Sequence, residues 1–212
     1  MGNCREVEIK SRSLRVYEHE DLLDPGTGKC YAGSWVWDCA LVLSHWLDKV
    51  AALNPGMFEG KRVVELGAGT GLPGLVASVH GAEVVLTDKL ELLPGLRRNI
   101  EENDLQGRVR AQVYEWGKDC KDLAPPVDYI LMSDVLYDID STPSLCKSLL
   151  DLSDERTQIL LAYELRPGTT DCFKIMRNMM LQWTRVPKEE LDPGWQSEDI
   201  GIFRVWRRSE GS

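Results

Sequence analysis

The stretch "RVVELGAGTGLPGLVASVHGAEVVLTDKL", residues 62–90, decides the fold of this chain. An apolar run opens it, a second apolar run ends at Asp88, and four glycines stand between the two: Gly67, Gly69, Gly71 and Gly74. Glycine loses more backbone freedom on folding than any other residue, so this cluster is entropically costly. The cost predicts a backbone that must turn tightly or lie directly against a ligand.

Short apolar runs alternate with helical patterns on both sides of this stretch. Strands are expected at 62–66, 83–88, 108–116, 127–137, 157–165, 183–191 and 199–208, and one or two more within 6–20. Helices are expected at 72–80, 92–103, 143–152 and 171–181. A further helix carries an apolar stripe from Cys39 to Val50, with Asp38 as its predicted N-cap.

Alternating strands and helices predict an α/β fold, with a mostly parallel sheet covered by helices on both faces. The last two strands form a hairpin-like pair, which predicts an antiparallel edge strand. No repeat or linker interrupts the pattern, so we expect one domain over residues 1–212, with residues 1–34 as an N-terminal strand extension.

Composition narrows the classes of function. The net charge is −9, which disfavours binding to a nucleic-acid backbone and suits a cationic substrate, although such charge also serves solubility. The six cysteines show no metal-ligand spacing, so we expect no metal site. They fit a protein of a reducing compartment, which we expect to be the cytoplasm, with the nucleus as a second location. The opening "MGNCRE" carries Glu6 where N-myristoylation needs Ser or Thr, so we expect no membrane anchor.

The glycine loop ends the first parallel strand, where open α/β sheets bind their ligands. Its spacing fits a dinucleotide fingerprint, and Asp88 stands where a carboxylate accepts ribose hydroxyls, which suits NAD and S-adenosylmethionine (SAM) equally. Glu65 favours SAM, because an acid repels a pyrophosphate but attracts the sulfonium and ammonium of SAM. The alternative is a tight turn that binds nothing.

Four segments together resemble one family: "VVELGAGTGLPGL", "VWDCALVLSHWL", "VYEWG" and "MSDVLY". They are similar to the seven-strand SAM-dependent methyltransferases, within the methyltransferase-like protein-lysine family that modifies chaperones and AAA ATPases. The resemblance covers roughly residues 30–206 and implies a Rossmann-like seven-stranded sheet. It also implies methylation of a lysine in a non-histone protein such as a chaperone or AAA ATPase.

The resemblance implies seven cofactor-binding residues, Trp37, Gly67, Ala68, Gly69, Asp88, Trp116 and Ser133, and the charge argument above adds Glu65 as the eighth. By that resemblance, residues 67–69 touch the methionine part, Asp88 holds the ribose, Trp116 borders the adenine and Trp37 packs nearby. Ser133 stands where the family commonly has alanine, and both residues are small. Trp37 is alternatively a core residue, and Trp116 a strand-end residue that fills a gap.

Asp134 and Tyr137 form a D-x-x-Y pattern that resembles the family signature after the fourth strand. We expect the acid to hold the acceptor amine by charge-assisted hydrogen bonds and the ring by cation–π contact. Val135 and Leu136 replace the prolines of the N/D-P-P-Y motif, which argues against a nucleic-acid substrate. Alternatively, Asp134 caps the strand end and Tyr137 is a packing residue.

Glu164 and Arg166 resemble the E-x-R of the family after the fifth strand. They either shape the substrate channel or pair with each other. Three other functions remain open at this point: a small-molecule methyltransferase on the same fold, a non-catalytic scaffold that binds a chaperone, and a nicotinamide oxidoreductase, which Glu65 disfavours. We expect a monomer.

Overall fold

The computed structural model describes residues 3–9, 12–18, 22–24, 26, 28–166 and 170–208. Its main sheet contains seven strands: β3 (Arg62–Leu66), β4 (Glu83–Asp88), β5 (Val109–Val113), β6 (Tyr129–Ser133), β7 (Gln158–Glu164), β8 (Leu181–Arg185) and β9 (Ile200–Arg207). Their order is β5-β4-β3-β6-β7-β9-β8. The first five are parallel, and β9 runs antiparallel to both β7 and β8. The predicted Rossmann-like sheet is confirmed, with its antiparallel strand one position in from the edge.

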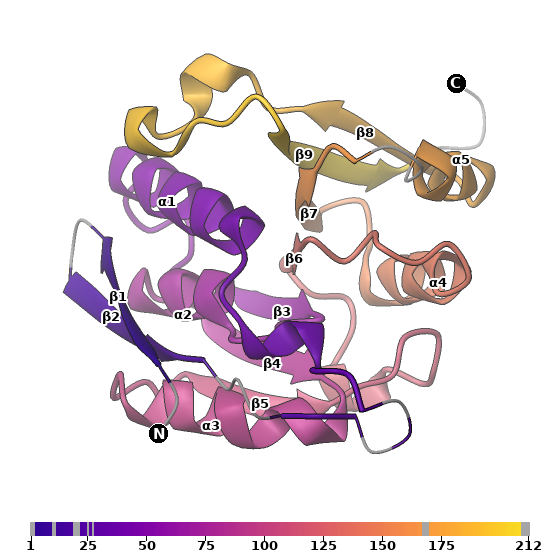
Figure 1. The fold of residues 1–212 in the computed structure, drawn as a ribbon. Coiled ribbons are helices and arrows are strands. Elements are labelled where there is room, and N and C mark those ends of the chain that lie inside the picture. Colours follow the sequence, from indigo (N-terminus) through magenta and orange to yellow (C-terminus); the bar gives the residue numbers. More distant parts are fainter. Residues whose placement is uncertain are drawn as a thin grey trace.

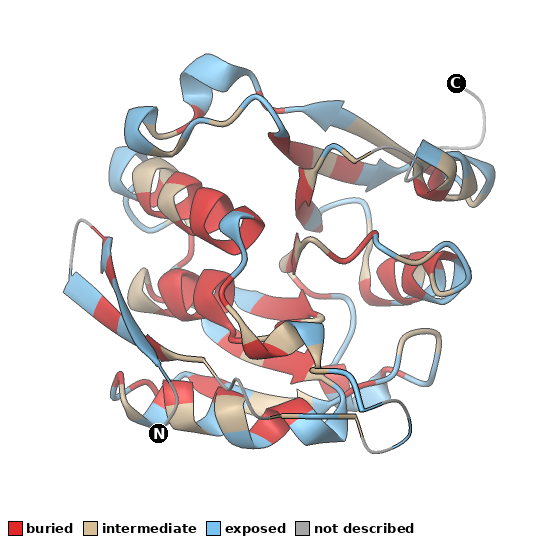
Figure 2. Cartoon of the chain, in the orientation of Figure 1, coloured by how far each residue is buried: buried red, intermediate tan, exposed pale blue. Residues whose placement is uncertain are grey.

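Five helices cover the two faces of this sheet: α1 (Asp38–Leu53), α2 (Leu72–Val79), α3 (Leu93–Glu101), α4 (Thr142–Leu152) and α5 (Thr170–Asn178). Alternate strand residues point to opposite faces, so Val63 packs with α1 and α2, whereas Val64 packs with α4 and α5. Figure 1 shows these two helix layers on either side of the sheet, and Figure 2 shows that the buried residues line the inner faces.

The start of α1 corrects one expectation. Trp37 occupies the N-cap position without a side-chain capping bond, and Asp38 is the first helical residue. The prediction of Asp38 as N-cap was therefore wrong by one position. The Asp38 carboxylate lies in the first turn instead, where it complements the positive end of the helix dipole. The predicted stripe is confirmed, because Cys39, Leu43 and Leu47 are buried.

Strands β1 (Cys4–Ile9) and β2 (Arg12–Tyr17) form a separate antiparallel pair that docks on α3. The backbone N–H of Tyr17 donates to Asn99 Oδ1 at 2.8 Å, and that of Arg15 donates to Asn103 Oδ1 at 2.9 Å. Asn103 returns a bond to the Arg15 carbonyl at 2.7 Å. The two buried amides therefore take the place of a neighbouring strand along the edge of β2.

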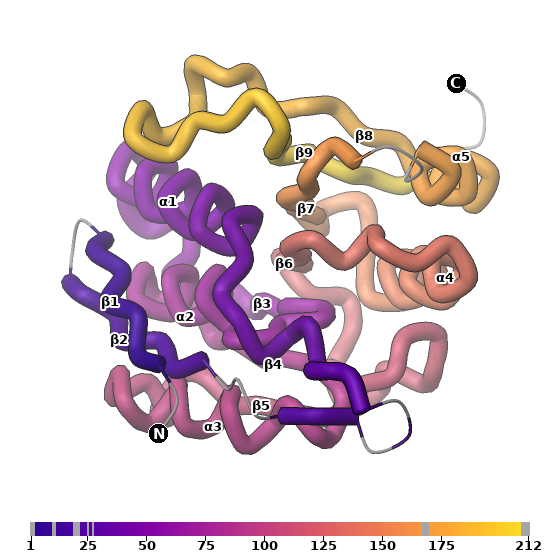
Figure 3. Tube along the Cα trace, viewed as in Figure 1, coloured from indigo at the N-terminus to yellow at the C-terminus, as the bar shows by residue number. Residues whose placement is uncertain are grey.

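Residues 28–37, which lead into α1, lie against the loop after β3, since a Cβ on Gly33 would lie 3.2 Å from Gly69 Cα (Figure 3). This segment contains a short 3₁₀ turn, Ala32–Ser34, which brings Gly33 against the glycine loop. In the part of the chain that the structure describes, no helix has the length and apolar character to span a membrane.

Candidate active site

The loop after β3 has a backbone that favours glycine. Gly67, Gly69 and Gly71 have φ angles of 63°, 56° and 82°, in the left-handed region that side chains disfavour. The loop closes with a bond from Gly71 N–H to the Ala68 carbonyl at 2.7 Å, and α2 follows with Pro73 in its first turn. The turn is held further by the Ala68 N–H, which donates to the Thr87 carbonyl at 3.0 Å, so residues 67–71 form a fixed stretch of backbone with few side chains.

Two of these glycines lie against other parts of the predicted site. A Cβ on Gly67 would lie 3.0 Å from Val135 Cγ1 and 3.1 Å from Trp116 Cζ2. A Cβ on Gly69 would lie 3.0 Å from the carbonyl oxygen of Gly33. The structure thus brings Trp116 beside Gly67 and Gly33 beside Gly69. That Trp116 borders the adenine stays a prediction, and sequence reasoning missed Gly33. The signal was present, because small residues in "YAGSW" precede the first tryptophans.

The fourth glycine serves packing. A Cβ on Gly74 would lie 2.4 Å from Leu86 Cδ2 and 2.7 Å from Glu65 Oε2, so a side chain there would separate α2 from the sheet. Glu65 itself is fully buried, and its Oε2 accepts the Gly74 N–H at 2.8 Å. Its Oε1 has no hydrogen-bond partner among the described residues.

The burial of Glu65 weakens the expectation that its negative charge would repel the pyrophosphate of NAD and favour SAM. Burial raises the pKa of this carboxyl to about 8, with a smaller contribution from Asp88, while the Gly74 amide opposes the shift. At neutral pH the group is mostly protonated, so repulsion of a pyrophosphate is weak. The bond to Gly74 shows that Glu65 joins β3 to the first turn of α2, and its part in cofactor binding stays a prediction.

Asp88 joins the second strand end to the glycine loop. Its Oδ2 accepts the Gly69 N–H at 2.8 Å, and its Oδ1 accepts the Lys89 N–H at 2.8 Å. Burial raises the pKa of this carboxyl, and the two amides oppose that shift. Each carboxylate oxygen retains a second lone pair, so both can still accept a hydroxyl hydrogen from a ligand.

Trp37 and Ser133 lie on either side of this loop region in the sequence and differ in exposure. Trp37 is 42% exposed, and its Nε1–H donates to the Ala32 carbonyl at 2.7 Å, so it is not the core residue of the alternative interpretation. The ring centroids of Trp37 and Trp35 lie 6.3 Å apart, and the two rings are arranged edge to face. Ser133 is half-buried at the end of β6, where it pairs with Ala162 of β7.

Asp134 follows β6 directly and has a φ of 55°, a left-handed conformation that Asp tolerates better than most residues. Its N–H donates to the Ala162 carbonyl at 2.9 Å. Its side chain is only 9% exposed, and Oδ2 accepts a bond from Arg166 Nη2 at 2.6 Å. Its Oδ1 is buried and has no hydrogen-bond partner among the described residues.

Glu164 and Arg166 pair with each other, as one interpretation of the sequence predicted. Arg166 donates from Nε to Glu164 Oε2 at 2.9 Å, and from Nη2 to the same oxygen at 2.5 Å. Because Nη2 also reaches Asp134, the E-x-R and the D-x-x-Y belong to one network. Sequence reasoning missed this link, although the ends of neighbouring parallel strands meet at one edge of a sheet.

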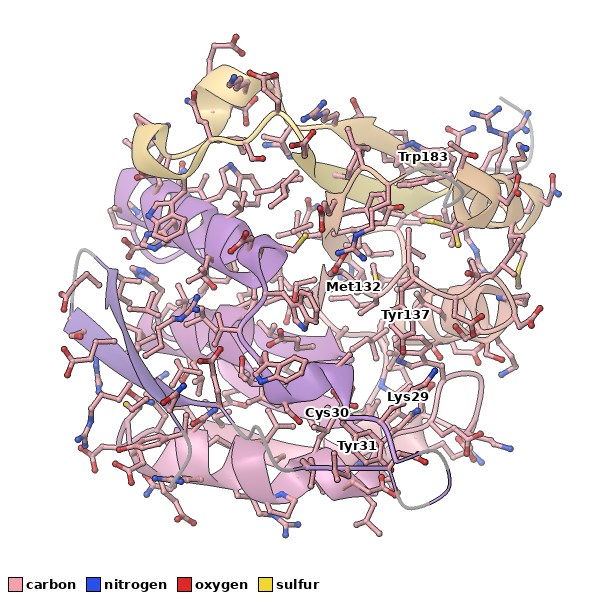
Figure 4. The ribbon with its side chains drawn as sticks, in the orientation of Figure 1. Lys29, Cys30, Tyr31, Met132, Tyr137 and Trp183 are labelled. Atoms are coloured by element: carbon pink, nitrogen blue, oxygen red, sulfur yellow. The ribbon has the colours of Figure 1, made fainter. Side chains whose placement is uncertain are left out.

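Tyr137 stands apart from that network, on the loop between β6 and α4. The residue is 60% exposed, yet burial of its hydroxyl raises its pKa, followed by the charges of Asp88 and Asp138. Figure 4 marks Tyr137 in the same view as Lys29, Cys30 and Tyr31 of the segment that leads to α1.

The arrangement combines two kinds of surface at the carboxyl ends of the strands. One offers bare backbone, an aromatic ring and the Asp88 carboxylate, which fits a ligand with hydroxyl groups and a flat base. The other offers the buried Asp134 carboxylate, which fits a cation. Among the described residues, no group of three or more His, Cys, Asp or Glu side chains could hold a metal ion.

Comparison with known proteins agrees with this geometry. The family described as lysine methyltransferase matches residues 21–180. Protein N-lysine methyltransferase METTL21A from Xenopus tropicalis is 37% identical over 97% of this chain and 92% of its own length. Histone-arginine methyltransferase METTL23 from Xenopus laevis is 31% identical over 100% and 99% of the two chains.

Solved structures support the fold. A SAM-dependent methyltransferase from Agrobacterium tumefaciens superposes with a TM-score of 0.60 at 16% identity, over 99% of this chain and 71% of that chain. This chain belongs to the lysine methyltransferase family, and SAM is its cofactor. The predicted family, enzyme class and cofactor are thereby confirmed, and the nicotinamide alternative is excluded.

Proposed function

We propose that this protein methylates a lysine side chain of a non-histone protein, a chaperone or an AAA ATPase such as valosin-containing protein. One observation carries the proposal: a buried carboxylate, Asp134, ends the strand next to the glycine loop, and one of its oxygens lacks a partner among the described residues. A buried carboxylate oxygen without a donor is costly. A lysine ammonium would supply the missing donor.

The residues of the loop fit the cofactor that the family uses. We assign the methionine part of SAM to the bare backbone of residues 67–69, the ribose to Asp88 and the adenine border to Trp116, with Trp37 and Ser133 nearby. When bound, SAM supplies a methyl group carried on a sulfonium. Asp88 is already oriented by the Gly69 amide, so little side-chain entropy is lost when it accepts ribose hydroxyls.

The acceptor half then holds the amine. Asp134 grips the lysine ammonium by charge-assisted hydrogen bonds, and the exposed Tyr137 ring lies where a cation can pack on its face. Fixing the nitrogen at near-attack distance replaces an encounter in solution by a positioned reaction. The proton must leave before the nitrogen attacks. A nearby sulfonium favours that loss, whereas the Asp134 carboxylate opposes it.

Exposed apolar side chains favour a protein over a small-molecule substrate. They stand at or after the strand ends or before α1: Trp37 at 42%, Tyr137 at 60%, Ile139 at 45% and Leu165 at 46% exposure. Apolar surface left open around a functional site is typical of a surface that another protein covers. The intact glycine loop, Asp88 and Asp134 argue against a scaffold that has lost its activity.

The test is incubation of the purified protein with tritiated SAM and a cell lysate, followed by mass spectrometry of the labelled band. We expect labelled lysine in one or a few proteins, and loss of label with Asp134→Asn. The matched control is Asp122→Asn, which changes an exposed acid in the 3₁₀ turn Lys121–Leu123. Label confined to small molecules would favour the small-molecule enzyme, and no label on any acceptor would favour the scaffold.

We also propose that the protein acts as a monomer in the cytoplasm, and also in the nucleus, as one domain with residues 1–34 as an extension. The acidic composition and the scattered, unbridged cysteines of the described chain support the compartment. Val7, Leu14 and Val16 of the N-terminal strands pack into the same core as α1 and α2, which supports the single domain.

A further inference from the structure

The acceptor carboxylate already has an occupant. Arg166 Nη2 donates to Asp134 Oδ2 at 2.6 Å, while the other oxygen, Oδ1, is buried and has no hydrogen-bond partner among the described residues. Arg166 is itself held by Glu164 through two bonds to one oxygen, so the guanidinium is fixed from its own strand end. Asp134 therefore has one oxygen without a donor, and not two, for an incoming cation.

We propose that Arg166 is a specificity-determining residue that makes Asp134 a one-point acceptor site, suited to the ammonium of lysine and unsuited to the guanidinium of arginine. The inference rests on the proposed function, in which Asp134 grips the acceptor. A guanidinium binds a carboxylate best through two parallel N–H bonds, which need both oxygens in one plane. An ammonium is a compact donor that needs only one oxygen.

The charges of this cluster agree with the assignment. Asp134 and Glu164 bring two carboxylates and Arg166 brings one guanidinium, so the cluster is one positive charge short of neutrality when all three are ionised. One lysine ammonium completes it. The Cys39 thiol on the first turn of α1 stays uncharged beside this cluster, because burial and then the Asp134 charge raise its pKa.

Backbone geometry limits other ways for Asp134 to adapt. Its left-handed φ of 55° and its N–H bond to the Ala162 carbonyl fix the Cα–Cβ direction at the strand end. With that direction fixed and Oδ2 bound to Arg166, rotation of the carboxylate would break a charge-assisted bond. Removing Arg166 frees that rotation and leaves Oδ2 without its donor, so neither oxygen has a partner and the two together can accept from a bidentate ligand.

The test uses two peptides that span the lysine found in the lysate experiment, one with Lys and one with Arg at that position. Methyl transfer from SAM and binding in the presence of S-adenosylhomocysteine are measured for each peptide. For the unchanged protein we expect the Lys peptide to be preferred in both measurements. Arg166→Met should lower the Lys-to-Arg preference by at least about tenfold, because a tenfold change in affinity corresponds to about one charge-assisted hydrogen bond.

Glu164→Gln provides a second variant if Arg166→Met fails to fold, because Glu164 is 41% exposed and its loss only loosens Arg166. It should shift the preference in the same direction by a smaller factor. The control is Arg156→Met, whose side chain is 88% exposed in another ion pair, and it should leave the preference unchanged. A variant that merely damages folding lowers methyl transfer to both peptides, and binding of both, by the same factor.

Two failures are distinguishable. If the lysate experiment labels no lysine, the proposed function fails and the inference fails with it. If lysine is labelled, but the Lys-to-Arg preference is the same with and without Arg166, the proposed function stands and the specificity role of Arg166 is overturned.

Discussion

The proposed site has a cofactor half, the glycine loop with Asp88, and an acceptor half, Asp134 with Arg166 and Glu164, and the two are built in different ways. In the cofactor half, backbone groups dominate: left-handed glycines, the amide of Gly69 on Asp88 and the amide of Gly74 on Glu65. In the acceptor half, side chains hold one another, since Arg166 joins Asp134 to Glu164. A backbone site is fixed by the fold, whereas a side-chain network can change partners through single substitutions. The comparison explains how a shared cofactor half can serve different acceptors.

The largest expected effect separates the halves by function. Asp134→Asn keeps the side-chain size and tolerates the left-handed backbone, but it removes the charge that, by our proposal, holds the amine. Turnover should fall by at least about a hundredfold, because positioning accounts for several kcal/mol in such reactions. Affinity for S-adenosylhomocysteine, measured by calorimetry, should stay within a few-fold. If turnover and S-adenosylhomocysteine affinity fall by the same factor, Asp134 contributes to cofactor binding and the two halves do not act separately.

Asp88→Asn tests the cofactor half, because it should lower the affinity for SAM, whereas Asp134→Asn should lower turnover. Hydrogen bonds to a charged group contribute about 1.5–3 kcal/mol each, so SAM affinity should fall by about tenfold to a hundredfold. The side-chain oxygen of Asn can accept the Gly69 N–H and keep the loop in position, but its amide nitrogen cannot accept the Lys89 N–H. The free energy of unfolding should fall by about 1 kcal/mol, the size of one hydrogen bond. Unchanged SAM affinity would remove Asp88 from the site.

The same contrast explains what the sequence could predict. The strand–helix order, the glycine loop and Asp88 were readable, because left-handed turns and strand ends leave a local signature of residue types. Arg166 on Asp134 was not readable, since it joins residues 32 positions apart whose side-chain directions depend on the packed sheet. The complete burial of Glu65 could not be predicted from the sequence either. Because burial raises its pKa, the charge of Glu65 toward a ligand could not be predicted from its position in the motif.

Gly67→Ala tests how strictly the backbone defines the cofactor half. Its Cβ would lie about 3 Å from both Val135 and Trp116, on a left-handed residue. We expect the free energy of unfolding to fall by about 1–3 kcal/mol and SAM affinity to fall with it, because the ring of Trp116 must move. Gly107→Ala is the control, since nothing lies within 4 Å of a Cβ there. Equal stability of the two variants in urea unfolding would contradict the prediction.

Glu65 makes the stability of the cofactor half depend on pH. Its pKa is about 8 when folded, against an ordinary value of 4.5, so between these values the folded state keeps a proton that the unfolded state releases. Raising the pH through this window therefore favours unfolding, by at most about 1.4 kcal/mol per pH unit.

Urea unfolding of the wild type and Glu65→Gln at pH 5.5 and 7.5 measures this contribution. The wild type should lose about 1 kcal/mol per pH unit more than the variant, since all other groups titrate alike in both proteins. The glutamine amide oxygen can still accept the Gly74 N–H. If the two proteins lose stability in parallel, Glu65 is ionised in the folded state and its buried oxygen has a partner.

The smallest expected effect concerns Tyr137, which follows Asp134 by three positions and whose pKa is raised by burial and then by the charge of Asp88. Tyr137→Phe keeps the ring for cation–π contact and removes only a hydroxyl, so turnover should fall by no more than a few-fold. Tyr137→Ala removes the ring and should cost more, about 0.5–2 kcal/mol in acceptor binding. Combined with Asp134→Asn, the ring variant should be sub-additive if both residues hold the same amine. Full additivity, with the loss of Tyr137→Phe appearing in SAM affinity instead of acceptor KM, would move Tyr137 into the cofactor half.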